Sequence, residues 1–161
     1  MLKVQFHKCR NIAHPFPIFA WAIMLFQGML PWRKNSWSHM CLSSNGVFFD
    51  SQFTGTQRTL EKDYLETYKL LETVEIELDI TTVDIDTWFS KHQGKDYDFL
   101  QLFGLLFKYF NLTKVNHIGK DLDKLICSEL LVAFLIEFKG VEVNDTDNYD
   151  LLNTWKLLES L

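Results

Sequence analysis

The sequence predicts an α+β fold in which helices pack on an antiparallel sheet. Segments with the alternation typical of strands are concentrated before residue 80, whereas apolar residues at helical spacing dominate the later part. No low-complexity linker or internal repeat divides the chain, and 47% of its 161 residues are hydrophobic. This is enough apolar material for one core, so we expect a single domain over residues 1–161.

Five segments have the alternation or the β-rich composition of strands. They are Lys3–His7, Ser36–Leu42, Val47–Phe53, Thr56–Leu60 and Thr73–Asp79. Between the second and the third lies Ser43-Ser44-Asn45-Gly46, a sequence typical of tight turns. These two segments therefore form the clearest hairpin signal of the chain.

Six further segments have the spacing or the composition of helices. They are Phe16–Trp32, Glu61–Leu71, Asp84–His92, Asp98–Phe110, Leu122–Phe138 and Tyr149–Leu161. Asp98 is expected to cap the helix that follows it, because a carboxylate accepts hydrogen bonds from unpaired amides of a first turn. Tyr97 is either structural or part of the lining of a site.

The apolar segment Phe16–Trp32 is marginal for a membrane span, because it contains Pro17 and Gln27 and is only about 17 residues long. It also lies too far from Met1 to be a secretory signal. We therefore expect a buried or interfacial helix in a protein made in the cytoplasm. Contact with a membrane surface or with another protein through Phe16–Trp32 is the alternative.

Charge and cysteine content exclude several classes of function. With 16 basic and 21 acidic side chains the net charge is −5, the wrong sign for binding a phosphate backbone, so no nucleic acid partner is expected. Residues 1–60 hold six basic side chains but only one acidic one, Asp50, so an anionic substrate would meet this part. Cys9, Cys41 and Cys127 lack the spacing of a disulfide framework or a thiolate zinc site.

A catalytic thiol needs a lowered pKa, which a helix N-terminus and a neighbouring imidazole provide. Cys127 precedes a long apolar segment and could stand at such a terminus. His39 lies in the first strand of the predicted hairpin and Asp50 in the second, so both side chains can share one face of the sheet. The candidate catalytic residues are therefore Cys127, His39 and Asp50.

Four motifs in this order resemble the permuted papain-like cysteine amidases of the YiiX type. They are Ser38-His39-Met40-Cys41-Leu42, Phe48-Phe49-Asp50, Tyr97-Asp98-Phe99-Leu100-Gln101-Leu102 and Ile126-Cys127-Ser128-Glu129-Leu130. That group belongs to the NlpC-like superfamily and is similar in plan to lecithin retinol acyltransferase. The resemblance spans roughly residues 34 to 135.

This resemblance implies a circularly permuted papain-like fold, with Cys127 as nucleophile, His39 as base and Asp50 as the group that orients the imidazole. It also implies hydrolysis of amides, with peptidoglycan peptides or lipid-like amides and esters as substrates in a bacterial setting. The aromatic and Asn-rich character of the chain points to a phage setting, including incorporation in a phage particle. The alternatives are an inactive binding or structural module and a thiol acyltransferase acting on lipid. No cofactor is expected, since Cys9, His7 and His14 have the atom types but not the spacing of a zinc site.

Each candidate also has a purely structural interpretation. Cys127 could be a small core residue, His39 a hydrogen-bonded sheet histidine and Asp50 a carboxylate at the end of a turn. The start of the last long helix decides between the interpretations, because a helix beginning at Asp121 would bury Cys127 in its second turn. We expect residues 121–125 to form a loop or separate turn, the helix to begin at Ile126 or Cys127, and the Cys127 sulfur to lie about 3 to 5 Å from a ring nitrogen of His39.

Overall fold

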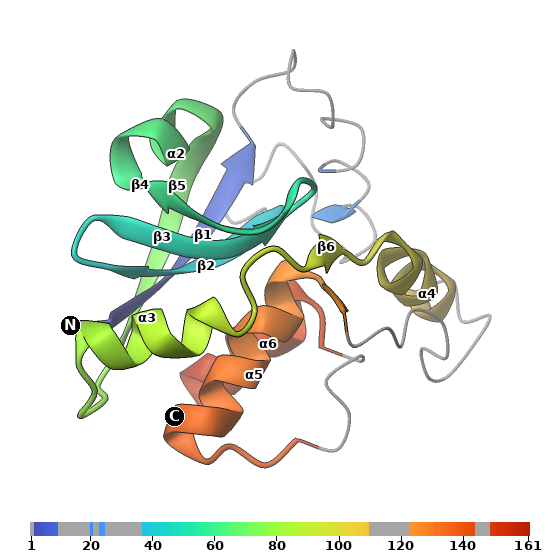
Figure 1. The fold of residues 1–161 in the computed structure, drawn as a ribbon. Helices are drawn as coiled ribbons and strands as arrows, with labels where there is room; N and C mark the ends of the chain where they lie inside the picture. Colours follow the sequence, from blue (N-terminus) through green and yellow to red (C-terminus); the bar gives the residue numbers. More distant parts are fainter. Residues whose placement is uncertain (1, 10–19, 21–22, 25–36, 110–122, 144–148) are drawn as a thin grey trace.

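The computed structural model describes residues 2–9, 20, 23–24, 37–109, 123–143 and 149–161. Five strands form an antiparallel sheet in the order β4-β3-β2-β1-β5 (Figure 1). Their bounds are β1 Leu2–Cys9, β2 His39–Ser44, β3 Val47–Gln52, β4 Gly55–Leu60 and β5 Tyr68–Ile76. The predicted α+β class with an antiparallel sheet is thus confirmed.

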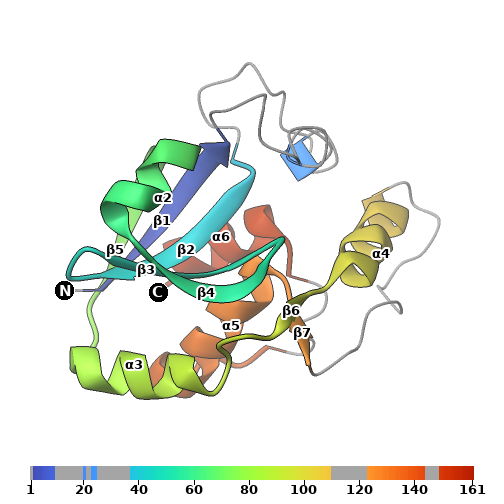
Figure 2. The same cartoon turned by 45° about the horizontal axis from the view of Figure 1, so that its top comes forward.

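Helices cover both faces of this sheet. They are α2 (Glu61–Thr67), α3 (Thr82–Ser90), α4 (Phe99–Tyr109), α5 (Cys127–Lys139) and α6 (Leu151–Glu159). Figures 1 and 2 show α2 on one side of the sheet and α3, α5 and α6 on the other, with α4 standing away from the strands. A short parallel pair, β6 (Asp96–Tyr97) and β7 (Lys124–Leu125), leads into α4 and α5 respectively.

The β2–β3 hairpin has a two-residue turn at Asn45 and Gly46, with Ser44 opposite Val47. Both turn residues have positive φ, 51° at Asn45 and 77° at Gly46. Asn-Gly suits this geometry, because such a turn needs positive φ at both positions and matches the twist of the strands it joins. The hairpin predicted around Ser43–Gly46 is therefore confirmed.

The main core lies between the sheet and the helices on its α5 side. Alternate residues of β1 and β2, together with Phe49 of β3, face α5 because successive side chains of a strand point to opposite faces. Phe134 of α5 is fully buried in this core, and Phe49 packs edge-on against Phe89 of α3 with ring centroids 5.1 Å apart. The buried members are Leu2, Val4, Phe6, Ile23, Trp37, Met40, Leu42, Phe49, Ile76, Ile85, Trp88, Phe89, Cys127, Leu130, Leu131, Phe134, Leu135, Leu151 and Leu158.

Two helix bounds that follow from spacing and composition alone are wrong, whereas the explicit prediction that the last long helix begins at Ile126 or Cys127 is confirmed. The helix predicted over Glu61–Leu71 ends at Thr67, because the chain from Tyr68 onward pairs with β1 instead. The helix predicted from Leu122 begins only at Cys127, because Lys124 and Leu125 pair with β6. In both places hydrogen bonding to a distant strand overrides local helix propensity.

The remaining predicted helices and strands agree with the structure to within a few residues. Asp98 caps α4 as predicted, since its Oδ1 accepts from the Gln101 amide at 2.8 Å. The apolar segment Phe16–Trp32 lies almost wholly outside the described residues, apart from the buried helical residues Ala20, Ile23 and Met24. Within the part of the chain that is described, no helix has the length and apolar character needed to cross a bilayer.

Candidate functional site

His39 and Asp50 meet on the α2 side of the sheet. His39 is the first residue of β2, and Asp50 lies on β3 across the hairpin. Asp50 Oδ2 is 2.9 Å from His39 Nε2, so the carboxylate accepts a hydrogen bond from the imidazole. Asp50 is completely buried and His39 is 6% exposed, which makes this a desolvated pair rather than a surface ion pair.

Gln52 holds the carboxylate that bonds to the imidazole. Its Nε2 donates to the same Asp50 oxygen at 3.0 Å. Asp50 is thus held by a second donor from its own strand, two residues along and on the same face. Because Nε2 of His39 faces Asp50, the other ring nitrogen, Nδ1, is left for a second partner.

Cys127 is the first residue of α5, which confirms the predicted start of this helix. Ile126 precedes it in extended conformation, and the Ile126 amide donates to Glu129 Oε2 at 3.0 Å. The approach to the helix is fixed by β7, whose Leu125 carbonyl accepts from Ser51 Oγ at 2.6 Å. Of the segment predicted to be a loop or turn, residues 121 and 122 lie outside the description, and 124–125 form the short strand β7.

The charge of Cys127 acts on the imidazole of His39. Burial by itself would lower the pKa of His39, but the negative charge of Cys127 and the hydrogen bond that Asp50 accepts from the imidazole outweigh it. The pKa of His39 is raised to about 10. The three side chains singled out in the sequence therefore lie in one cluster, in which His39 stands between Asp50 and Cys127.

An aromatic column, Tyr68–Tyr64–Phe48, lies against the imidazole. The Tyr68 ring stacks on His39 with centroids 5.1 Å apart and planes 25° from parallel. Tyr64 stacks on Tyr68 at 4.6 Å, and Phe48 on Tyr64 at 4.5 Å. Sequence reasoning missed these residues, because Tyr64 and Tyr68 belong to the segment predicted as one long helix.

His7 is a second buried histidine of this face, directly across from His39 on β1. Burial, with a smaller effect of the charge of His39, lowers the pKa of His7 to about 3. His7 therefore stays neutral, and it packs edge-on against Tyr64 at 4.9 Å. Its role is to fill the sheet face beside the cluster rather than to carry charge.

Tyr97 lies in β6, where it pairs with Leu125, two residues before Cys127. Burial raises the pKa of Tyr97 well above its usual range, and the charge of Cys127 adds to this effect. Tyr97 also packs in one apolar cluster with Ile126, the residue immediately before the thiol. Tyr97 thus has a structural role in this cluster, and its part in lining a catalytic site stays a prediction.

Cys41 and the metal-ligating side chains of the described residues are the other chemical candidates. Cys41 is a buried free thiol whose sulfur is 3.9 Å from the Gln5 carbonyl oxygen, and it stands in mid-strand without a helix terminus. No group of three or more metal-ligating side chains comes together within the described ranges. The His14 side chain and the Cys9 side chain lie outside the description.

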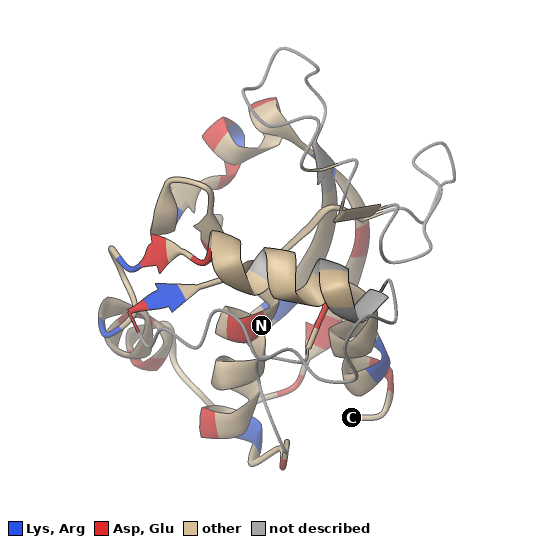
Figure 3. Cartoon of the chain, turned by 90° about the vertical axis from the view of Figure 1, so that its right-hand side faces the viewer, with Lys and Arg blue, Asp and Glu red and all other residues tan. Residues whose placement is uncertain are grey.

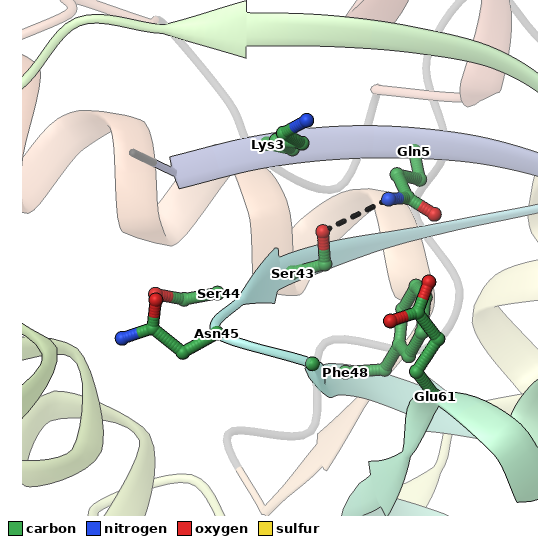
Figure 4. Close-up of a pocket in the computed structure, with 8 residues that line it drawn as sticks. Lys3, Gln5, Ser43, Ser44, Asn45, Phe48 and Glu61 are labelled. Atoms are coloured by element: carbon green, nitrogen blue, oxygen red, sulfur yellow. Dashed lines mark hydrogen bonds between the residues drawn. The ribbon is translucent and has the colours of Figure 1, made fainter.

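A separate polar pocket of about 210 Å³ lies at the hairpin end of the same face (Figure 4). Gln5 and Ser43 line it, and Gln5 Nε2 donates to Ser43 Oγ at 3.1 Å. Ser43 is four residues along β2 from His39, a separation of about 13 Å at the usual strand rise. This pocket is therefore not part of the Cys127 cluster.

No protein family, curated protein or solved structure matches this chain.

Proposed function

We propose that this protein is a cysteine-dependent amide hydrolase with a circularly permuted papain-like fold. Cys127 is the nucleophile, His39 the general base and acid, and Asp50 the group that orients the imidazole. The observation that carries the proposal is the hydrogen bond between His39 and Asp50 together with the position of Cys127 on the first residue of a helix, where its charge raises the pKa of the same imidazole. A nucleophile next to a base that is itself held by a third group is the arrangement that covalent acyl transfer requires.

In the proposed mechanism, the imidazole of His39 takes the proton of the Cys127 thiol before attack. Asp50 accepts the Nε2 hydrogen of His39, so Nδ1 takes the proton of the thiol. The raised pKa of His39 favours its charged form beside Cys127. The amides of the first turn of α5 stabilise the thiolate by about 0.3 to 1 kcal/mol, and by up to about 2 kcal/mol where the site is partly buried.

Attack of the thiolate on an amide carbonyl forms the carbon–sulfur bond of a tetrahedral intermediate. The backbone N–H of Cys127 at the helix start is a donor to the oxyanion. Collapse of the intermediate breaks the carbon–nitrogen bond, and His39 gives its proton to the leaving amine. Water then attacks the thioester with His39 as base, which releases the acid and restores the thiol.

The substrate class implied by this chemistry is an amide with an accessible carbonyl, either a peptide or an acyl-amide. Peptidoglycan peptides belong to this class and are the first bacterial substrates to assay. A lipid acyltransferase would use the same acyl-enzyme but pass the acyl group to an acceptor other than water. Product analysis therefore separates the two reactions.

Selective alkylation tests the proposal without knowledge of the substrate. Iodoacetamide near neutral pH should modify Cys127 at least about tenfold faster than Cys41, because only Cys127 combines a helix terminus with an imidazole. Peptide mass spectrometry measures the two rates in one sample, so Cys41 serves as an internal control. Replacing His39 by Ala should remove the difference, whereas equal rates in the unaltered protein would contradict the proposed nucleophile.

A further inference from the structure

A pocket of about 270 Å³ lies between β6, β7 and the beginning of α4. The apolar part of its wall comes from Phe53, Tyr97, Phe99 and Leu100. Phe53 stacks nearly parallel to Phe99 with centroids 5.6 Å apart, and Tyr97 packs against both rings. The wall is thus an ordered aromatic cluster with an open side.

This pocket adjoins the start of the nucleophile's helix. Tyr97, which lines it, pairs with Leu125 in the register of β6 and β7, two residues before Cys127. Tyr97 and Phe53 also pack in the apolar cluster that contains Ile126. One side chain, Tyr97, therefore both lines the pocket and lies within electrostatic reach of the Cys127 sulfur.

The apolar surface continues from the pocket along α4. Phe99, Phe103 and Phe107 recur every four residues and so share one face of the helix. Their exposed fractions are 37%, 48% and 43%, and Leu100 beside them is 57% exposed. Figure 3 looks at this side of the molecule and shows no charged residue along the described part of α4.

Charged groups stand only at the rim of the pocket. Asp96 and Lys124 lie opposite each other in the β6–β7 pair, and their charges have opposite sign. Asp98 is directed inward, where its Oδ1 accepts from the Gln101 amide. Asp96 and Lys124 therefore offset each other's charge, and the apolar part of the wall favours a ligand group that gains from leaving water.

We propose that this pocket is the specificity subsite of the amidase and takes a bulky apolar group next to the scissile amide. The inference rests on the proposed function and adds the substrate class to it. A cavity of roughly 150 Å³ holds a benzene molecule, so this larger pocket holds an aromatic or branched aliphatic side chain. The apolar face of α4 extends the subsite for longer chains.

The apolar group that binds in the subsite could belong to either of two kinds of substrate. One is a peptide with a large apolar residue, and the other is an acyl-amide with a hydrocarbon chain. A series of fluorogenic amides that differ in one group, alanyl, leucyl, phenylalanyl and octanoyl, distinguishes them. We expect kcat/KM to rise about 10- to 100-fold from alanyl to phenylalanyl, because each buried methylene contributes to binding of the transition state. A further rise with octanoyl identifies the hydrocarbon chain as the source, whereas a fall identifies the peptide.

Replacing Leu100 by Asp places a charge in the apolar wall and should reduce the phenylalanyl-to-alanyl ratio of kcat/KM to about 1. The matched control is Val83→Asp, which places the same charge on α3 at a residue that is 70% exposed and outside the pocket. The control should keep the ratio of the unaltered protein. An unchanged ratio in Leu100→Asp, or a flat series in the active unaltered protein, overturns the subsite.

A binding measurement separates failure of the subsite from failure of the proposed function. In the Cys127→Ala protein, N-acetyl-phenylalaninamide should shift the NMR signals of Tyr97 and Leu100, and N-acetyl-alaninamide should do so at least about tenfold more weakly. If no amide is cleaved but this selectivity is found, the amidase proposal fails and the apolar site stands. If amides are cleaved but the two ligands bind equally weakly, the apolar site fails and the amidase stands.

Discussion

The two faces of the central sheet are made by the same strands but carry different chemistry. On the α5 side, Phe49 and its neighbours form a continuous apolar core with Phe134. On the α2 side, one residue further along the same strand, Asp50 is completely buried and bonded to His39. A protein that needed only stability would gain from apolar residues on both faces, because burying a charged pair costs desolvation energy.

Under the proposed function, the α5 side maintains the fold and the α2 side holds the base and the carboxylate that orients it. α5 connects the two, since its buried residues, Cys127 included, pack in the core while the charge of Cys127 acts on His39. Substitutions on the two faces should therefore separate stability from activity.

The largest expected effect is on activity alone. Cys127→Ala should lower amide cleavage by at least about 1,000-fold, because no other group can form the acyl-enzyme. Its melting temperature should stay close to that of the unaltered protein, since only one sulfur is removed. Cys41→Ala is the matched control and should retain cleavage. Comparable loss of activity in both variants would show that buried thiols on this face act through packing.

On the opposite face, Phe134→Ala should destabilise the protein by about 3 to 5 kcal/mol. Phe134 is fully buried, and its removal leaves a cavity among Trp88 and other core side chains. Urea denaturation measures the free energy of unfolding. Iodoacetamide labelling of the folded fraction should still favour Cys127, and loss of that preference would mean that the two faces are not separable.

Asp50→Asn is expected to lower kcat/KM roughly 100-fold, because the imidazole loses its anionic partner. Asp50 raises the pKa of His39, which is about 10 in the intact site. Losing this contribution moves the pKa downward, so the alkaline fall in activity should occur at lower pH in the variant. A pH profile of kcat/KM measures the shift. An identical alkaline limb in both proteins would show that His39 does not set it.

The smallest expected effect is on stability, at the place where the start of β4 packs against Lys95, the residue just before β6. Gly55 has a φ of +101°, and a Cβ there would stand 2.7 Å from the Lys95 carbonyl oxygen. Gly55→Ala should therefore cost about 1 to 3 kcal/mol and disturb the neighbouring bond from the Thr56 amide to Lys95. Gly94→Ala is the control, because it has a positive φ of 82° but nothing within 4 Å of its Cβ. Equal losses of stability in thermal unfolding would mean that backbone strain alone matters.

Local patterns in the sequence determined the hairpin, the Asp98 cap and the pairing of His39 with Asp50. Each depends on residues close together in the chain: Asn45-Gly46 fixes the turn, and the period of two along a strand then puts both side chains on one face. The helix start at Cys127 came from the resemblance of its motif, since periodicity alone would have allowed a start at Asp121.

Only the tertiary structure decided what surrounds this cluster. Tyr68 looked like part of a helix, but pairing with β1 makes it a strand residue and stacks its ring on His39. His7 could be recognised as a strand residue but not as a neighbour of His39, because β1 and β2 are separated by a long connection. Tyr97 reaches Cys127 through the parallel pairing of β6 with β7. Contacts between residues close together in the chain follow from local backbone geometry, so the sequence alone predicts them. Pairings between distant segments depend on how the whole chain buries its apolar residues and satisfies its hydrogen bonds, so only the tertiary structure shows them.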